Sequence, residues 1–252
     1  MNGHSIMQNQ TALITGAAKR IGAEISRILH AEGMNIVIHY RSSRDEAQAL
    51  CNELNALRAD SAIILAADLL KLSDINQLVK QATDYWGQLD VLINNASTFY
   101  PTPVGDITEH HWDDLLGSNL KAPLFLSQAA SPELKKTHGN IINIVDVHGF
   151  RPMKNHPVYC AAKAGLAMLT QSLAKELGPE IRVNGVAPGA ILWPESNMEQ
   201  DIELRETILD RTALKRQGTP KDIAATVRFL IRDADYITGQ VIPVCGGRSL
   251  NI

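Results

Sequence analysis

The stretch TALITGAAKRIG, residues 11–22, decides the fold class of this chain. An apolar run ends in a turn framed by Gly16 and Gly22, and helical spacing begins directly after it. A strand, a glycine turn and a helix start, in this order, place backbone N–H groups and the positive helix end against a pyrophosphate. Gly16 permits the turn, and Gly22 permits close packing of the helix on the strand. The stretch therefore predicts the first βα unit of a nucleotide-binding sheet.

Arg20 stands in this turn where a third glycine is the common choice. Its charge is unfavourable beside the positive helix end unless an anionic or acceptor group is bound. We therefore expect Arg20 to contact the cofactor phosphates or the substrate. The alternative is that the loop tolerates the arginine without using it.

Beyond this turn, short β-branched runs alternate with longer helical segments. Strands are expected at 11–15, 35–40, 61–67, 89–96, 140–145, 181–187 and 240–244. Helices are expected at 20–32, 44–57, 73–86 with Ser73 as N-cap, 108–118, 120–135, 157–177 and 220–232, and a polar amphipathic piece is expected near 199–211. Strands that are apolar on both faces are typical of a parallel sheet covered by helices on both sides.

The predicted organisation is a single α/β domain over residues 1–252, with a Rossmann-type doubly wound parallel sheet of about seven strands. Residues 188–219 form a long irregular segment, and such loops in compact domains are usually lids or binding loops. We therefore expect this segment to be a substrate-binding lid. Trp193 within it either contacts the substrate or packs the lid.

Composition excludes several classes of function. Lysine and arginine number 24 and acidic residues 27, a balance that gives no support to binding nucleic acid or a membrane surface. No run approaches the roughly 18 to 20 apolar residues of a membrane span, and the start MNGHSIMQNQ lacks the pattern of a signal peptide. Cysteines and histidines show no disulfide or metal-ligand spacing. We expect a cytoplasmic protein with no metal.

The second strand ends in HYRSS, residues 39–43, and this ending predicts the cofactor. NAD-binding folds tend to place an acid near this point to hold the ribose 2′-OH. Arg41, Ser42 and Ser43 stand here instead. A guanidinium and two hydroxyls suit a 2′-phosphate, which an acid would repel. NADPH is therefore predicted over NADH, with a solvated loop arginine as the alternative.

Tyr159 and Lys163 in VYCAAKAG are candidates for proton transfer. Four residues apart on a helix, they lie on one face about one turn apart. A tyrosine with a pKa of about 10 is a poor acid–base group at neutral pH. A nearby ammonium favours the phenolate and eases proton exchange. Both residues are common on helices, so the pair alone is a weak signal.

Several motifs occur together in one order: Thr15-Gly16 with Gly22, Asp68-Leu69, NNA at 94–96, Asn119, Tyr159 with Lys163, and Pro188-Gly189. In this combination the sequence resembles the short-chain dehydrogenase/reductase family over nearly its whole length. The resemblance implies that Tyr159 donates the proton, that Lys163 lowers the pKa of Tyr159 and binds nicotinamide ribose, and that Asn119 supports a proton-relay water.

The sequence departs from the family at one position of the site. The family usually has a serine thirteen residues before the tyrosine, where it polarises a substrate carbonyl, and this chain has Asp146. An ionised carboxylate is a poor donor to an oxyanion, but it suits a substrate with N–H groups or a ring nitrogen that takes a proton. The alternative is that Asp146 caps the turn before His148.

Within the family, Asp146 together with GAAKRIG, HYRSS and NNASTFYPTP resembles the pteridine reductases. This resemblance implies an Asp–Tyr–Lys set that reduces a dihydropterin to a tetrahydropterin with NADPH. Oxidised pterins and dihydrofolate are further candidate substrates. Arg20 would be the arginine of the phosphate loop, and Phe99 would stack on the pterin. Phe99 could instead anchor its own loop.

The predicted site is therefore large. The catalytic residues are Asp146, Tyr159, Lys163 and Asn119. The cofactor-binding residues are Gly16, Arg20, Ile21, Tyr40, Arg41, Ser42, Ser43, Asp68, Leu69, Asn95, Ala96, Ser97, Tyr159, Lys163, Pro188 and Gly189. The substrate-binding residues are Arg20, Ser97, Phe99, Asp146, Tyr159 and Trp193. The resemblance also implies a homotetramer. Two other functions stay open: a general carbonyl or 3-oxoacyl reductase, and a non-catalytic NADP-binding sensor.

Overall fold

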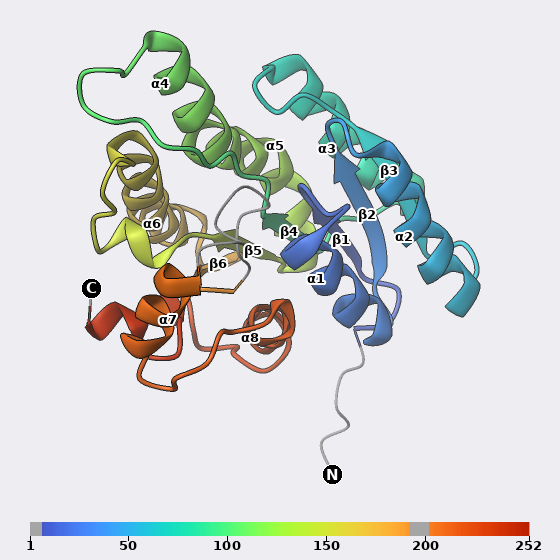
Figure 1. The fold of residues 1–252 in the computed structure, drawn as a ribbon. Helices are drawn as coiled ribbons and strands as arrows, with labels where there is room; N and C mark the ends of the chain where they lie inside the picture. The colour runs from blue at the N-terminus through green and yellow to red at the C-terminus, as the bar shows by residue number, and fades with distance from the viewer. Residues whose placement is uncertain (1–6, 192–201, 252) are drawn as a thin grey trace.

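The computed structural model describes residues 7–191 and 202–251, which form one parallel sheet with helices on both faces (Figure 1). The strands are β1 (Thr11–Ile14), β2 (Asn35–Tyr40), β3 (Ala62–Ala66), β4 (Val91–Asn94), β5 (Asn140–Ile144), β6 (Arg182–Pro188) and β7 (Val241–Val244). Their order is β3-β2-β1-β4-β5-β6-β7, and every neighbouring pair is parallel. The predicted doubly wound Rossmann-type sheet is confirmed.

Alternation along the strands assigns the helices to the two faces. The helices are α1 (Arg20–Ala31), α2 (Arg44–Leu57), α3 (Leu72–Trp86), α4 (Glu109–Leu116), α5 (Ala122–Thr137), α6 (Pro157–Leu177), α7 (Ile202–Asp210) and α8 (Pro220–Arg232). Ile14 and Ile38 belong to a buried cluster with residues of α1, α2 and α8. Their neighbours Leu13 and Val37 belong to a second cluster with residues of α3, α5 and α6. Both faces of the sheet are therefore covered, as the apolar strands predict.

Two expected helix boundaries are wrong. Ser73 is not the N-cap of α3, because the helix already begins at Leu72 and Lys71 is its N-cap. The two helices expected at 108–118 and 120–135 are one continuous run, since the π-helical turn Gly117–Lys121 joins α4 to α5. Turns of this kind inside helices are frequent at functional sites, and this one carries Asn119.

The strand order reverses between β1 and β4, and in open α/β sheets ligands bind outside the carboxyl ends of the strands at such a point.

Among the helices that the structure describes, none is long and apolar enough to cross a membrane.

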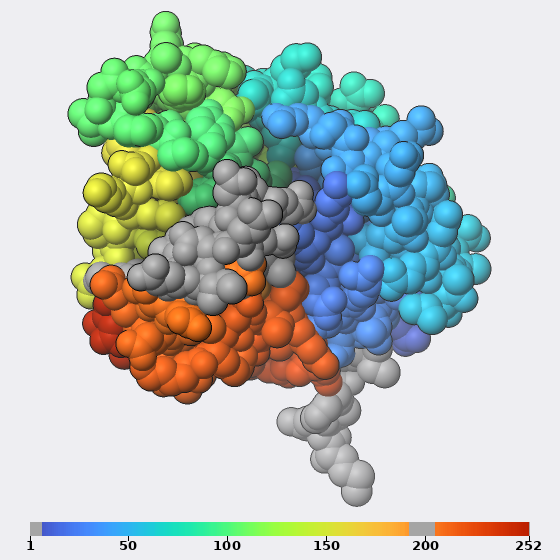
Figure 2. Space-filling model, in the orientation of Figure 1, coloured from blue at the N-terminus to red at the C-terminus, as the bar shows by residue number. Residues whose placement is uncertain are grey.

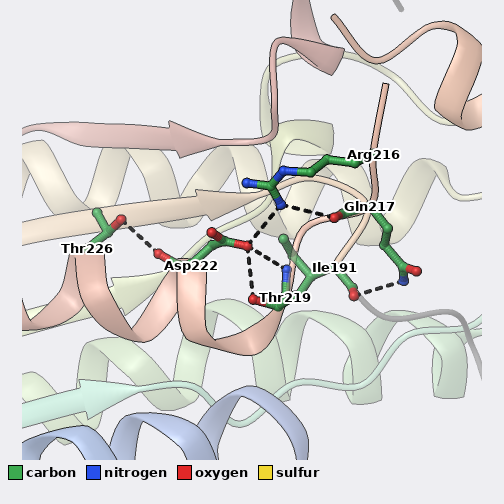
Figure 3. A network of polar contacts seen from close by, with 6 residues as sticks. All are labelled: Ile191, Arg216, Gln217, Thr219, Asp222 and Thr226. Atoms are coloured by element: carbon green, nitrogen blue, oxygen red, sulfur yellow. Dashed lines mark hydrogen bonds and ion pairs between the residues drawn. The ribbon is translucent and has the colours of Figure 1, made fainter. Parts of the chain in front are cut away.

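Contacts at the start of α8 fix one rim of this edge (Figure 3). Asp222 Oδ2 accepts the backbone N–H and the hydroxyl of Thr219 at 2.7 and 3.0 Å, and it lies 3.5 Å from Arg216 Nη1. Gln217 Nε2 donates to the carbonyl of Ile191 at 2.9 Å. The chain after β6 is thereby joined to the chain before α8. Trp193 lies outside the described residues.

Candidate active site

A cavity of about 830 Å³ opens at the carboxyl ends of the strands. In Figure 2 the surface is hollowed between the blue segments around β1 and the green segments that follow β4. With two exceptions, every residue of the predicted site lines this cavity. The exceptions are Asn119, which is fully buried, and Trp193, which the structure does not describe. The fold therefore collects at one place residues that are scattered over more than half of the chain.

Neighbours on both sides hold the glycine turn. On one side, Thr15 Oγ1 accepts the N–H groups of Asn95 and Ala96 at 2.9 and 3.0 Å. The Asn95 side chain donates in return to the carbonyls of Thr15 and Gly16. On the other side, the N–H of Gly16 donates to His39 Nδ1 at 3.1 Å. The turn is thus fixed before any ligand binds.

His39 at the end of β2 is a support of this turn that the sequence did not single out. Burial lowers the pKa of His39 to about 4, so the ring is neutral at pH 7. Because Nδ1 accepts from Gly16, Nε2 carries the hydrogen and faces the carbonyl of Ala67 at 3.2 Å. One fixed tautomer therefore links the glycine turn to the end of β3.

Glycine is required at position 22 because neighbouring atoms lie too close to leave room for a side chain. A Cβ at this position would lie 2.6 Å from the carbonyl oxygen of Gly16 and 2.7 Å from Asn95 Nδ2. No side chain fits there without moving the turn. The predicted need for glycine is confirmed, although the partner in contact is the turn itself and Asn95, and not the strand.

Arg20 begins α1 with a φ of 55°, in the left-handed region. A residue with a Cβ pays roughly 1–2 kcal/mol for this conformation, which glycine adopts freely. The residue lines the cavity, so the strained backbone lies where a ligand would touch the side chain. Strain of this kind clusters at ligand-binding sites.

Asp146 and Tyr159 form a direct hydrogen bond. The Tyr159 hydroxyl donates to Asp146 Oδ2 at 2.8 Å, and the backbone N–H of His148 donates to Asp146 Oδ1 at 2.8 Å. Asp146 follows β5 and caps the 3-10 turn η2 (Val147–Gly149). The capping role considered for Asp146 is therefore confirmed on one oxygen, while the other oxygen accepts from Tyr159, and the two hydrogen bonds together fix the carboxylate against the tyrosine.

The pKa of Tyr159 is shifted in the direction opposite to the prediction. Burial raises it well above its ordinary value, and the charge and hydrogen bond of Asp146 raise it further, because both favour the neutral phenol. Lys163 does not counter this shift. Its Nζ lies 5.7 Å from the centre of the Tyr159 ring and donates to the carbonyl of Ile144 at 3.0 Å. Burial lowers the pKa of Lys163 to about 8.

Asn119 lies behind the cavity wall. Its Nδ2 donates to the carbonyls of Thr98 and Leu115 at 2.9 and 3.0 Å, and its Oδ1 accepts the hydroxyl of Ser97 at 2.7 Å. These bonds use the amide to hold Ser97 and Thr98, which line the cavity. The role that the structure supports for Asn119 is therefore positioning of the loop after β4.

Phe99 presents an aromatic ring to the cavity. The ring stacks on the His156 ring, with ring centroids 4.7 Å apart and planes inclined by 10°. It also packs against the Tyr159 ring in a T-shaped arrangement, with centroids 4.8 Å apart. Phe99 nonetheless remains 43% exposed. A buried loop anchor would be covered on both faces, so this geometry favours a ligand-facing role over the anchoring role.

The opposite end of the cavity carries the residues predicted for the adenine side of the cofactor. Tyr40, Arg41, Ser42 and Ser43 line it at the end of β2, and Arg41 and Ser42 are exposed. Asp68 lines it at the end of β3, but its carboxylate already accepts the N–H of Leu70 at 3.2 Å.

Several lining residues escaped prediction. They include His39, Met153, Ile208 and Arg248. Arg248 could have been predicted from the sequence. Gly246 and Gly247 form a glycine turn directly after the last strand, at the edge of the sheet where ligands bind.

Comparison with known proteins places the chain in a family. A family model described as enoyl-(acyl carrier protein) reductase matches residues 16–249. The 3-oxoacyl-[acyl-carrier-protein] reductase FabG of Staphylococcus epidermidis is 38% identical over 242 residues, covering 95% of this chain and 98% of that protein. The Staphylococcus aureus FabG is 39% identical over 241 residues, covering 94% and 97%. Pteridine reductase 1 of Leishmania tarentolae is 37% identical over 280 residues, covering 95% and 96%.

These likenesses place the 3-oxoacyl reductases ahead of the pteridine reductase, so they do not confirm the resemblance to pteridine reductases. Both kinds of relative nevertheless agree on the larger family. Because the family model and the relatives span nearly all of the sequence, the chain is an oxidoreductase that belongs to the short-chain dehydrogenase/reductase family.

Proposed function

We propose that this oxidoreductase reduces the ring of a dihydropterin, using NADPH. The observation that carries the proposal is the carboxylate of Asp146, 2.8 Å from the hydroxyl of Tyr159. An ionised carboxylate repels the oxygen of a simple ketone, whose developing negative charge needs hydrogen-bond donors. It accepts readily from the N–H groups of a pterin. Phe99, half-exposed beside Tyr159, offers a face for the flat heterocycle.

The reaction adds one hydride and one proton across a C=N bond of the ring. NADPH, when bound, would supply the hydride to the carbon. Tyr159 donates its hydroxyl proton to the ring nitrogen, and Asp146 orients that hydroxyl. The high pKa of Tyr159 keeps the proton on the oxygen until the substrate takes it. Lys163, buried under the tyrosine, holds the nicotinamide ribose in this proposal.

The residues present fit NADPH. The glycine turn offers backbone N–H groups at the start of α1. Gly22 has no side chain, so the helix can lie close to this turn. No acid lies among Tyr40, Arg41, Ser42 and Ser43 at the end of β2, where a 2′-phosphate is expected. Arg41 would pair with that phosphate.

Replacing Arg41 with alanine should raise KM for NADPH roughly tenfold, because one charge-assisted hydrogen bond to a phosphate is lost at an exposed site. KM for NADH should change far less, since NADH has no 2′-phosphate. Arg44→Ala is the matched control, as Arg44 is also exposed and begins α2. Steady-state kinetics with both cofactors checks this. An unchanged preference for NADPH in Arg41→Ala would remove Arg41 from the cofactor site.

Replacing Arg20 with glycine should stabilise the protein and weaken binding together. The free energy of unfolding should rise by about 1 kcal/mol because glycine adopts the left-handed φ freely. KM for NADPH or for the pterin should rise because the guanidinium is lost. Arg20→Ala separates the effects, since it keeps the Cβ, and with it the cost of the left-handed φ, while it loses the rest of the side chain with the guanidinium. Urea denaturation and kinetics on both variants provide the measurement. If both KM values stay at wild type, the loop tolerates Arg20 and does not use it.

We also infer that the segment 188–219 borders the substrate within a single domain. Pro188, Gly189, Ala190, Ile191 and Ile208 line the cavity, so the described parts of this segment already reach the site. Differences among pterins lie in the tail, and this segment is where a tail would be read.

The second candidate is reduction of a 3-oxoacyl thioester, which the relatives in Staphylococcus favour. It would need Tyr159 to act alone on the carbonyl oxygen, beside a carboxylate. Identifying the product decides between the two. Incubation with NADPH and a dihydropterin should yield a tetrahydropterin, with one NADPH consumed per product. Product formed only from a 3-oxoacyl thioester would establish the second candidate.

A further inference from the structure

Arg248 brings a positive charge into the catalytic end of the cavity. It begins the 3-10 turn η3 (Arg248–Leu250), directly after Gly246 and Gly247. Arg248 and Asp146 line the same cavity although they lie about 100 residues apart in the chain. Nothing in the reduction itself uses a guanidinium here, so its place in the cavity needs an explanation.

The backbone that carries Arg248 is firmly held. A Cβ at Gly189 would lie 2.6 Å from the Cβ of Cys245, so the ends of β6 and β7 are in close contact. The side chain of Arg151 donates to the carbonyl of Ser249 at 3.2 Å, and the N–H of Leu214 donates to the carbonyl of Gly246 at 3.0 Å. The turn is therefore fixed against three separate segments, and it fixes the position from which Arg248 enters the cavity.

Among the described residues, the guanidinium of Arg248 keeps its N–H donors available for a ligand. Within residues 7–191 and 202–251, no protein group accepts a hydrogen bond from its side chain, although Arg248 is half-buried. Asp146 attracts it electrostatically, but the hydrogen bonds made by the two Asp146 oxygens come from Tyr159 and His148. A guanidinium carries five N–H donors. Several of these donors can therefore bind an anionic ligand at once.

A second cation lies near. Arg211, exposed after α7, is close enough to oppose the positive charge of Arg248. The backbone carbonyl of Arg211 accepts the side-chain amide of Asn251 at 3.0 Å, so this segment is joined to the end of η3. A second cation is therefore carried by the segment that is joined to the turn of Arg248. Like charges held together favour binding of an anion.

We propose that Arg248 binds an anionic group on the tail of the substrate, beyond the reacting ring. Resting on the proposed function, this makes a dihydropterin with a carboxylate in its tail, as in dihydrofolate, a better substrate than one with a neutral tail, as in dihydrobiopterin. A guanidinium pairs with a carboxylate through two parallel hydrogen bonds. The phosphates of a thioester carrier offer the same chemistry from another source.

The test compares kcat/KM for dihydrofolate and dihydrobiopterin, which share the ring and differ in the tail. In Arg248→Gln the ratio of the two values should fall about tenfold or more relative to wild type, since a charge-assisted bond to the carboxylate is lost. In Arg248→Lys the ratio should fall less, because lysine retains the positive charge but cannot form the two parallel hydrogen bonds of a guanidinium. Arg27→Gln, at an exposed arginine paired with Glu53 on α2, is the control and should keep the wild-type ratio. An unchanged ratio in Arg248→Gln overturns the proposal.

Two further arms separate this proposal from the proposed function. Equilibrium binding of folate and biopterin to the NADP⁺ complex, in which no hydride is available, should show the same loss of preference in Arg248→Gln. If the wild-type enzyme neither reduces nor binds a pterin, the proposed function has failed. The same comparison is then made with two thioesters: acetoacetyl-CoA, which carries phosphates, and the uncharged acetoacetyl N-acetylcysteamine thioester. A loss of preference for the charged thioester would then identify phosphate as the anion. Equal preference in wild type and Arg248→Gln across both pairs would overturn the role of Arg248 itself.

Discussion

Replacing Tyr159 with phenylalanine should lower kcat by about 10² to 10⁴, the range expected for loss of a general acid. In the proposed reaction the hydroxyl carries the proton that the substrate receives, and Asp146 is its hydrogen-bond acceptor. The ring itself should stay in place, since Tyr159 is 4% exposed and packs with Leu115 and Val158. KM for NADPH should therefore change little, and the loss should appear in kcat.

Tyr100→Phe is the matched control for this loss. Tyr100 also donates its hydroxyl to a carboxylate, Asp114 Oδ2 at 3.0 Å, and it follows Phe99 in the chain. Steady-state rates should fall strongly only in Tyr159→Phe. A Tyr159→Phe enzyme as fast as wild type would assign the proton to another group. A wild-type protein that binds NADPH but turns over no substrate would favour the sensor.

Replacing Asp146 with serine should change the substrate class. For a dihydropterin, kcat/KM should fall by about 10² to 10³, comparable to loss of one preorganised electrostatic contact. For a 3-oxoacyl thioester it should rise, because a hydroxyl at this position donates to a carbonyl oxygen where the carboxylate repels it. The two activities should move in opposite directions within one variant.

Asp146→Asn separates charge from the cap on the 3-10 turn. Its amide oxygen can still accept the N–H of His148, so the turn η2 should persist while the negative charge is lost. Thermal unfolding should show Asp146→Asn close to wild type, with pterin reduction impaired. If Asp146→Ser lowers both activities equally and unfolds early while Asp146→Asn keeps full activity, the carboxylate serves only to cap the turn.

Much of the fold follows from local pattern. Apolar runs alone place all seven strands, because a strand covered on both faces needs continuous apolar residues wherever the sheet passes. Gly22 follows from the need for close approach in the first turn. The place of the cavity follows as well, since parallel strands end at one edge and the residues just after them meet there.

The parts of the site that escaped prediction depend on contacts between distant segments. The direction of the Tyr159 pKa shift is set by burial and by Asp146 on another element, and the spacing from Lys163 does not reveal it. Asn119 lies in a π-helical turn, and its amide donates to the carbonyls of Thr98 and Leu115, contacts that the sequence does not reveal. Arg248 reaches the cavity because β7 ends beside β6.

The most direct test of the account is the ratio of kcat/KM values of the wild-type enzyme for 7,8-dihydrobiopterin and for acetoacetyl-CoA, with NADPH. A site built around the carboxylate of Asp146 should favour the pterin by at least about a hundredfold, because groups placed to pair with one substrate reject another that leaves them unpaired. A ratio that favours acetoacetyl-CoA would contradict the account and assign the enzyme to 3-oxoacyl reduction.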